Sequence, residues 1–475
     1  MRSMQRRELT TSKSTRLGSQ GLILIVAAFF LASTGVWAQE VWNGSVNAFW
    51  SNASNWTNGV APVAHNSLTF NTTSGTRITT NDLTAGTEYD NIVINGGQFF
   101  LSGNSISLGG TNPQFIVNSG TETINLSIAL LQDTTFQVNT GGSNPLLING
   151  AISGGYGITK TGANTMRFAA LQSYTGDTTI NTGTLDVTGD FLPHTAGTGN
   201  LIVNNGGTFD LNNTSANING LSGNGSVTKV GSGGRILTVG NNNANGSFSG
   251  TFNQNAGTLS LNKVGTGTQV LGGSMNNSGS ITVNGGMLLF DGTQTVGISN
   301  IFTVFSGATL GGTGSVLLAG SATTLLVNNG GTLAPGDSVG LFKINGGQGL
   351  VLASNANYAV DLNGLTFGSQ YDSTLVGSGL VNLSNSVLDV NLGFTPAVGS
   401  QFDILTNATG AAIEGTFAGL PEGSTFLDNS TDFEITYLGG TGNDVVLTVI
   451  PEPSSLVLAA SGLVMLMMFR RRSGR

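Results

Sequence analysis

The sequence predicts an all-β solenoid, in which short strands stack as successive coils around one core. Apolar and polar residues alternate around Gly turns, as in TTINTGTLDV (178–187) and SITVNGGMLLF (280–290), which is typical of half-buried strands. A short turn motif, Asn-x-Gly-x-[Phe/Leu], recurs along a chain that contains 73 Gly among 475 residues. Only 8% of the residues are charged and 39% are hydrophobic, so the chain can bury a large core.

Residues 1–38 are predicted to form a secretory signal peptide. A basic and polar stretch over residues 1–16 precedes the apolar run GLILIVAAFFLA at 21–32. Val36 and Ala38 occupy the positions that a signal peptidase reads, so we expect cleavage between Ala38 and Gln39. An N-terminal membrane anchor is the alternative, although the apolar run is short for a membrane span.

Residues 39–80 are predicted to form an N-terminal cap, because they hold Trp42, Trp50 and Trp56 within one short segment. The end of a solenoid exposes its core, and clustered Trp side chains could seal it. If exposed, the same side chains could stack on sugars, which leaves open a glycan-binding adhesin as an alternative.

Residues 81–346 are predicted to form the stacked coils. Successive Asn-x-Gly motifs fit one or more units of roughly 22 to 29 residues, a period typical of solenoids. Gly supplies the positive φ that a tight turn requires. The turn glycines expected at positive φ are Gly97, Gly183, Gly207, Gly257, Gly286 and Gly331.

A second motif accompanies the first. The sequences ITKTG, VTKVG and LNKVG place Lys160, Lys229 and Lys263 each 21 to 26 residues before an Asn-x-Gly turn. Because a catalytic base would not recur in every unit, we interpret these lysines as solvated turn or edge residues that discourage lateral strand pairing.

The segment ISGGYGITKTGANTMRFAALQSYTGDTTINTGTLDV (152–187) resembles the autotransporter-associated β-strand repeat. NNGGTLAPGDSVGLFKING (328–346) resembles the end of such arrays. The resemblance implies a right-handed parallel β-helix, as in passenger domains. Autotransporter passengers are followed by a membrane barrel, whereas this array leads into a different ending, so self-secretion is not expected.

Residues 347–449 are predicted to form a C-terminal β-domain, since strands such as NSVLDVNLGF (385–394) and NDVVLTV (443–449) are joined by longer turns. Residues 450–475 follow as a tail. Its uncharged residues 454–469 are predicted to form a single transmembrane helix with a basic end at 470–475.

The tail resembles a PEP-CTERM sorting signal in its order and spacing. The residues that carry the resemblance are Pro451, Glu452, Pro453, Arg470, Arg471 and Arg472. It implies transient anchoring in the inner membrane, cleavage near Pro451 to Pro453 by an exosortase-type processing enzyme, and release to the cell surface or extracellular matrix. The expected partners are the secretion machinery, signal peptidase and the processing enzyme, with exopolysaccharide as a further candidate.

No catalytic, cofactor-binding or metal-binding residue is predicted. The chain has no Cys, and residues 39–450 hold 7 basic and 22 acidic residues, which argues against nucleic-acid binding. His65 and His194, the two histidines, lack metal-ligand spacing. GGTGNDVVL (439–447) fits one copy of the calcium-binding nonapeptide through Asp444, but a Gly-rich hairpin turn is the favoured interpretation.

The sequence therefore predicts an exported structural or adhesive protein. Besides the glycan-binding adhesin, a polysaccharide lyase or glycosidase on a β-helix is a second alternative. A glycosidase requires two carboxylates that flank the bond, and no such pair is close in sequence.

Overall fold

The computed structural model describes residues 38–71, 77–139, 146–277, 279–297 and 302–452. The predicted signal sequence before Ala38, Pro453 and the predicted transmembrane and basic tail (454–475) lie outside these residues. The described residues form 47 strands and one short 3-10 helix, η1 (Ala53–Asn55). Within these residues no helix is long and apolar enough to cross a membrane.

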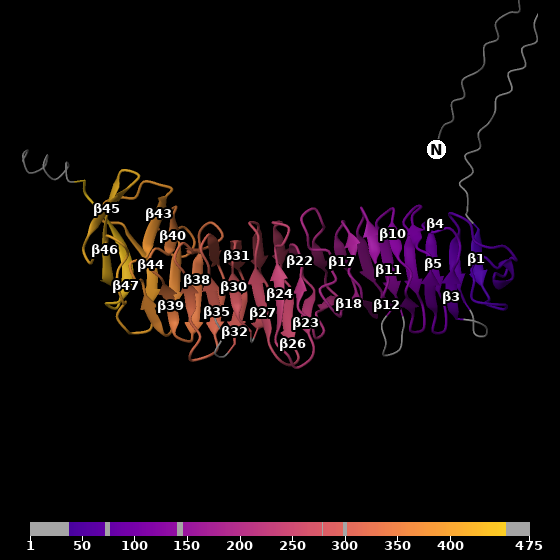
Figure 1. The fold of residues 1–475 in the computed structure, drawn as a ribbon. Helices are drawn as coiled ribbons and strands as arrows, with labels where there is room; N and C mark the ends of the chain where they lie inside the picture. Colours follow the sequence, from indigo (N-terminus) through magenta and orange to yellow (C-terminus); the bar gives the residue numbers. More distant parts are fainter. Residues whose placement is uncertain (1–37, 72–76, 140–145, 278, 298–301, 453–475) are drawn as a thin grey trace, which may run out of the picture. The chain divides into compact units, whose positions relative to one another are not determined.

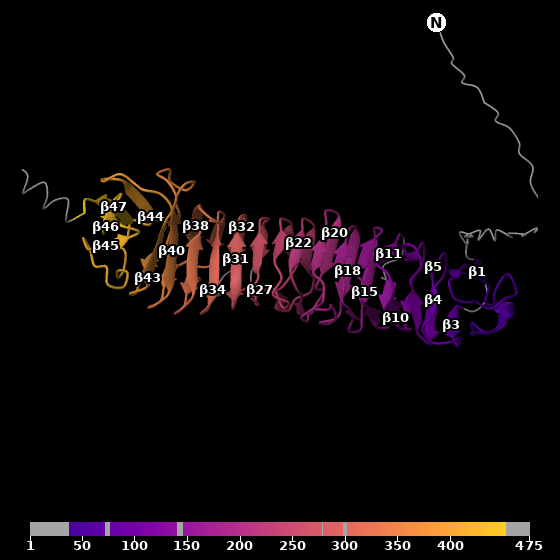
Figure 2. The ribbon, with the colours of Figure 1, turned by 90° about the horizontal axis from the view of Figure 1, so that it is seen from above.

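Parallel strands stack into three faces, and successive strands follow one another along the stack in both views (Figure 1, Figure 2). Face A contains 16 described strands, whose register partners lie 19 to 30 residues apart. Its strands are β1 (Gln39–Trp42), β2 (Ser67–Phe70), β5 (Asn91–Ile94), β8 (Gln114–Val117), β11 (Thr134–Val138), β14 (Ile158–Thr161), β17 (Thr178–Ile180), β19 (Leu201–Val203), β22 (Leu221–Gly223), β25 (Gly246–Phe248), β28 (Thr268–Leu271), β31 (Gly286–Phe290), β34 (Ala308–Gly312), β37 (Thr332–Pro335), β40 (Asn357–Leu362) and β43 (Val387–Leu392).

Face B runs beside face A, and each of its strands follows a face A strand in the chain. Its strands are β3 (Ile78–Asn81), β6 (Phe100–Gly103), β9 (Thr123–Ile124), β12 (Leu146–Ile148), β15 (Thr165–Phe168), β18 (Gly183–Val187), β20 (Gly207–Asp210), β23 (Ser226–Lys229), β26 (Thr251–Gln254), β29 (Met275–Asn277), β32 (Thr293–Val296), β35 (Ser315–Leu318), β38 (Leu341–Gly346), β41 (Ser373–Val376) and β44 (Gln401–Asn407).

The third face consists of two separate sheets, since no strand follows β18 before the chain returns to face A at β19. Face C forms the first part and face D the second. Face C contains β4 (Thr87–Tyr89), β7 (Ile106–Leu108), β10 (Ile128–Leu130), β13 (Ile152–Gly154) and β16 (Ser173–Tyr174). Face D contains β21 (Ala216–Asn217), β24 (Arg235–Val239), β27 (Leu259–Lys263), β30 (Ile281–Val283), β33 (Phe302–Val304), β36 (Leu325–Val327), β39 (Gly349–Leu352) and β42 (Leu380–Asn382).

The core follows from the two-residue period of the strands. In β11, Thr134, Phe136 and Val138 are buried while the residues between them are half-buried. Phe136 stacks on Phe115 of the neighbouring coil with ring centroids 5.6 Å apart. Repeated over the coils, inward Ile, Leu, Val and Phe side chains make one continuous core.

The Trp-containing segment closes the N-terminal end of this core. Trp42, Trp50 and Trp56 are almost completely buried, and the Trp56 indole nitrogen Nε1 donates to the Trp50 carbonyl at 2.8 Å. The Trp42 and Trp56 rings meet edge to face, and Phe70 of β2 packs against both. The three Trp side chains therefore act in the cap, and they are not available for stacking on sugars.

The expected boundary at residues 346 and 347 requires correction. Faces A and D continue with parallel pairing through β43 and β42, so the solenoid extends to Leu392. The topology changes at β44, which pairs in parallel with β41 and antiparallel with β47 (Asp444–Ile450). With β45 (Thr425–Asp428) and β46 (Thr431–Gly439), these strands form an antiparallel C-terminal cap. The longer turns after residue 347 were interpreted as the start of a new domain, but they connect strands that belong to parallel coils.

The turn glycines are confirmed at four of six positions. Gly97, Gly183, Gly257 and Gly286 have φ between 60° and 75°. The prediction was wrong for Gly207 and Gly331, because in each motif the preceding glycine takes the positive φ (Gly206, Gly330). There the amide of the second glycine donates to the carbonyl of Asn204 or Asn328 at 2.8 Å, which closes a four-residue turn whose third residue has positive φ.

Candidate functional site

The corner between faces A and B carries a ladder of Asn side chains. Asn95, Asn118 and Asn139 each follow the last residue of a face A strand in successive coils. The Asn118 amide Nδ2 donates to Asn95 Oδ1 at 2.8 Å, and the Asn139 amide donates to Asn118 Oδ1 at 2.7 Å. Asn204 and Asn181 repeat the contact at 2.8 Å. Because parallel strands are about 4.8 Å apart, the ladder presents amide groups at a regular spacing.

The three recurrent lysines are buried, so their interpretation as solvated residues was wrong. Lys160, Lys229 and Lys263 have 0% relative exposure. Lys160 is the second-to-last residue of β14 on face A, whereas Lys229 and Lys263 are the last residues of strands on faces B and D. Each side chain folds back over its own corner and donates to carbonyl oxygens there. Burial lowers the pKa of Lys160 and Lys263 to about 8.

Each buried lysine joins its own corner to the Asn-x-Gly turn of the next coil. Lys160 Nζ donates to the carbonyls of Thr161 at 2.7 Å, Gly162 at 2.9 Å and Thr182 at 3.1 Å. Lys263 Nζ makes the same three kinds of contact and reaches the Gly285 carbonyl at 3.0 Å, and Lys229 reaches that of Ala256. The two sequence motifs therefore occur together because they form one stacked corner.

A pocket of about 170 Å³ lies on the outer side of face A, over β31, β34, β37 and β40. Asp337, Asp361 and Asp372 contribute carboxylates to its lining. Asp372 is fixed by the fold, because Oδ1 accepts from the Gly340 amide at 2.7 Å and Oδ2 from the Asp361 amide at 2.8 Å. Burial raises the pKa of Asp372 to about 7. The pocket thus contains one structural carboxyl and two further acids.

Asp444 lies at the start of β47, directly after a hairpin turn that contains the glycines of the calcium-type motif. The Asp444 side chain is buried, and its Oδ1 accepts from the Asn407 amide at 2.7 Å. The hairpin joins antiparallel strands, whereas the calcium motif shares ligands between parallel stacked copies. The structure therefore supports the hairpin interpretation.

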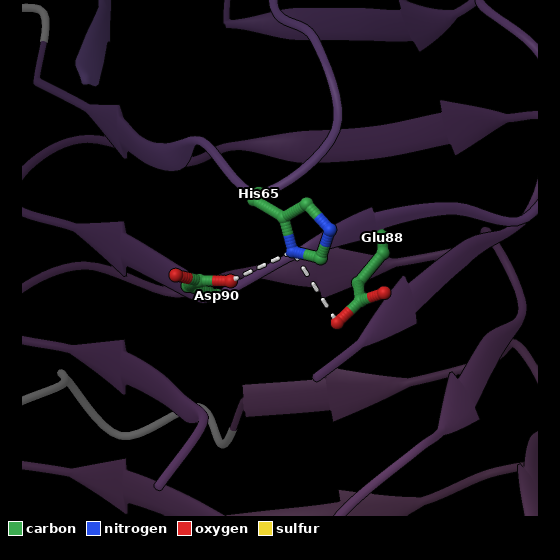
Figure 3. Close-up of side chains that lie close together, drawn as sticks. All are labelled: His65, Glu88 and Asp90. Atoms are coloured by element: carbon green, nitrogen blue, oxygen red, sulfur yellow. Dashed lines mark ion pairs between the residues drawn. The ribbon is translucent and has the colours of Figure 1, made fainter. Parts of the chain in front are cut away.

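The structure brings His65 together with Glu88 and Asp90, a cluster that the sequence analysis missed (Figure 3). His65 Nδ1 lies 3.5 Å from Glu88 Oε1 and 3.5 Å from Asp90 Oδ1. Their spacing in the sequence could have indicated the cluster, because Glu88 and Asp90 follow His65 by about one coil. His194 differs, because its Nδ1 lies 2.9 Å from the Leu192 carbonyl and 3.7 Å from one carboxylate, that of Asp190.

The predicted processing sites are only partly described. Ala38 is exposed and Gln39 begins β1, next to the predicted signal-peptide cleavage site. Pro451 and Glu452 follow the last cap strand, while Pro453, Arg470, Arg471 and Arg472 lie outside the described residues. Cleavage at either end stays a prediction.

Comparison with known proteins identifies autotransporter-associated repeats in this chain. Residues 158–187 and 261–289 match the model of the passenger-associated-transport-repeat family. Each match begins two residues before a buried lysine, Lys160 or Lys263, and includes the Asn-x-Gly turn that this lysine contacts.

A similar curated protein is the Adhesin BmaC autotransporter of Brucella suis biovar 1 (strain 1330), which is 28% identical over 313 residues. The matched region covers 63% of this chain and 8% of that adhesin. The chain therefore corresponds to a small part of that relative.

Proposed function

We propose that this chain is an exported, non-enzymatic surface protein with an adhesive or structural role. The parallel solenoid, the two repeat matches and the similarity to an autotransporter adhesin support this role. Sixteen described strands at about 4.8 Å per step make face A about 70 Å long. Such a stack offers a large and stiff surface for contact with another polymer.

The observation that carries the proposal is the corner ladder of Asn95, Asn118 and Asn139. Its amides hold one another between coils, so the row of donors and acceptors is ordered before any partner binds. An ordered surface loses little conformational entropy on binding. Neutral amides suit a hydroxyl-rich partner such as exopolysaccharide, and the acidic body does not suit a polyanion.

The proposal includes sorting by the PEP-CTERM-like tail. A signal peptide would start export, the tail would pause the chain in the inner membrane, and an exosortase-type enzyme would release it to the surface or matrix. Mass spectrometry of secreted protein checks this route. We expect mature chains that lack the residues after about Pro453, whereas released chains that retain Arg470 to Arg475 would contradict sorting.

The enzyme alternative is disfavoured by the face A pocket. Its volume of about 170 Å³ is below the roughly 300 to 1,000 Å³ typical of small-molecule sites. Both oxygens of Asp372 accept backbone hydrogen bonds, so this carboxyl holds the 336–340 loop and β40 together. Asp337 and Asp361 are the two acids left to act on a substrate.

A binding and turnover experiment separates the two functions. The full chain is tested on a glycan array and on polysaccharides, with release of reducing ends or unsaturated products measured in parallel. We expect binding without turnover. Turnover that Asp337→Asn or Asp361→Asn abolishes, and that the exposed cap variant Glu434→Gln leaves unchanged, would establish an enzyme instead.

A further inference from the structure

We propose that His65, Glu88 and Asp90 form a binding site for a divalent transition-metal ion of the Zn²⁺ class. Each residue offers one ligand atom, and the three atoms lie within 4.8 Å of one another (Figure 3). The site lies between the first coils of the solenoid, close to the Trp cap, and is separate from the adhesive ladder.

The backbone fixes all three ligands in advance. His65 lies in the turn before β2 with φ of 66°, and its amide donates to the Glu88 carbonyl at 2.8 Å. Glu88 lies within β4, and Asp90 stands between β4 and β5 with its amide 3.2 Å from the Asn66 carbonyl. Hydrogen bonds between neighbouring coils thus hold the three ligands in register, as a metal site requires.

The two distances from His65 to the carboxylates fit a tetrahedral ion. Zn²⁺ binds His nitrogen and carboxylate oxygen at about 2.0 to 2.2 Å, which separates neighbouring ligands of a tetrahedron by about 3.4 Å. His65 Nδ1 lies 3.5 Å from each of the two carboxylate oxygens. A charge-assisted hydrogen bond would bring the nitrogen to about 2.7 to 2.9 Å from one of them.

The neighbouring glycines leave room for the two carboxylates. Gly109 and Gly110 lie beside the acids, where a Cβ would come within 2.1 Å of Glu88 Oε1 and 2.6 Å of Asp90 Oδ1. Asp90 Oδ1 is buried and accepts no hydrogen bond from the described residues. The His65 side chain is 38% exposed, so an ion can enter and keep a water as its fourth ligand.

The ligand set selects the class of metal. Ca²⁺ and Mg²⁺ take oxygen ligands, whereas imidazole suits Zn²⁺ and its neighbours among the transition metals. One imidazole with two carboxylates and an open position is a set that Zn²⁺ accepts. A bound ion would cross-link the coil that contains His65 to the coil that contains Glu88 and Asp90, and would stabilise the N-terminal end by mass action.

The experiment measures Zn²⁺ binding to the full chain, purified without a histidine tag, by titration calorimetry. We expect one Zn²⁺ per chain, and Co²⁺ in its place should give the strong visible absorption of a tetrahedral site. His65→Asn is the main variant, because Asn tolerates positive φ, and it should weaken Zn²⁺ binding at least tenfold. His194→Asn is the matched control and should change the affinity less than twofold.

Glu88→Gln provides a second variant that keeps the backbone of the turn unchanged, and it should also weaken Zn²⁺ binding at least tenfold. Circular dichroism of each variant confirms that the solenoid is folded. The proposal fails if the wild-type chain binds no Zn²⁺ below millimolar concentration. It also fails if His65→Asn and His194→Asn bind equally well, or if Ca²⁺ binds in preference to Zn²⁺.

Discussion

At the scale of single residues, the buried lysines show how one side chain can hold a corner. Lys160→Met keeps the length and apolar stem but leaves three buried carbonyls without their donor, at about 1 to 3 kcal/mol for each buried unsatisfied group before relaxation. We expect a loss of about 2 to 4 kcal/mol in the free energy of unfolding, measured by urea denaturation. Lys343→Met, on an exposed position of β38, is the control and should cost less than about 0.5 kcal/mol.

Glu122 is a second residue whose burial has a measurable consequence. Its side chain is buried, and desolvation raises its pKa from 4.5 to about 8, although the Phe99 amide and Arg77 oppose the rise. The folded chain therefore binds a proton that the unfolded chain releases. The stability contributed by Glu122 is complete below pH 4.5 and is lost as the pH rises towards 8.

The comparison between wild type and Glu122→Gln checks this pH dependence. Asp372 and Asp403 have raised pKa values as well and give the same sign, so the difference between the two chains isolates Glu122. We expect wild type to lose more stability than Glu122→Gln between pH 4.5 and pH 8. The difference between the two losses in the free energy of unfolding should be on the order of 2 to 4 kcal/mol. Parallel pH profiles for the two chains would contradict the assignment.

At the scale of the turn, Gly206 and Gly207 show two different reasons why a position requires glycine: a positive φ, and a lack of space for a Cβ. Gly206 has φ of 91°, but a Cβ there would meet its nearest atoms at 3.5 Å. Gly207 lacks positive φ, but a Cβ there would lie 2.3 Å from the Ile180 carbonyl oxygen. We expect Gly206→Asn to cost less than about 1 kcal/mol, since Asn tolerates this conformation. Gly207→Ala should lower the free energy of unfolding by about 1 to 3 kcal/mol, because the new Cβ overlaps the Ile180 carbonyl oxygen. Urea denaturation of both variants measures these losses. If φ alone mattered, Gly206→Asn would be the more destabilising of the two.

The strands themselves were predictable, whereas the contacts between coils were not. The alternation in TTINTGTLDV places Ile180 and Leu185 inward, and both are buried as expected. The burial of Lys160 could not be predicted, because a buried ammonium is unfavourable unless carbonyls surround it. One of its three acceptor carbonyls, that of Thr182, belongs to a turn 22 residues away in the sequence. His65, Glu88 and Asp90 were missed for the same reason, since only the stacking register brings them together.

Within the repeats, the lysine corner does not keep to one face. Lys160 lies near the end of a strand of face A, Lys229 ends one of face B and Lys263 ends one of face D. The feature that the three copies share is therefore the local corner and its contact with the next coil, and this corner occurs after a strand of each of the three faces. The change of face, together with the variation in coil length, makes the spacing of the lysine motif uneven in the sequence.

At the scale of the whole solenoid, both ends need protection, because an open parallel strand pairs with other chains. The Trp cluster closes one end. At the other end β47 covers β44 in antiparallel pairing, and residues 414–416 continue face D, with the Leu383 amide donating to the Glu414 carbonyl at 2.8 Å. Tyr358 also stacks on Phe417 with ring centroids 5.9 Å apart, so the cap covers apolar core as well as strand edges.

A chain that ends after Ser400 should therefore self-associate. The deletion removes β44 to β47 and uncovers the strands β41, β42 and β43, together with Tyr358. Because the Trp cap still closes the other end, each truncated chain has only one end with uncovered strand edges. We therefore expect two chains to pair through these ends as closed dimers, and not to form fibres. Sedimentation velocity at micromolar concentration checks this, with a chain that ends after Ile450 as the monomeric control. If the truncated chain stays monomeric with an intact solenoid, the cap strands are not needed to protect this end. If it forms fibres, the Trp cap does not close the opposite end.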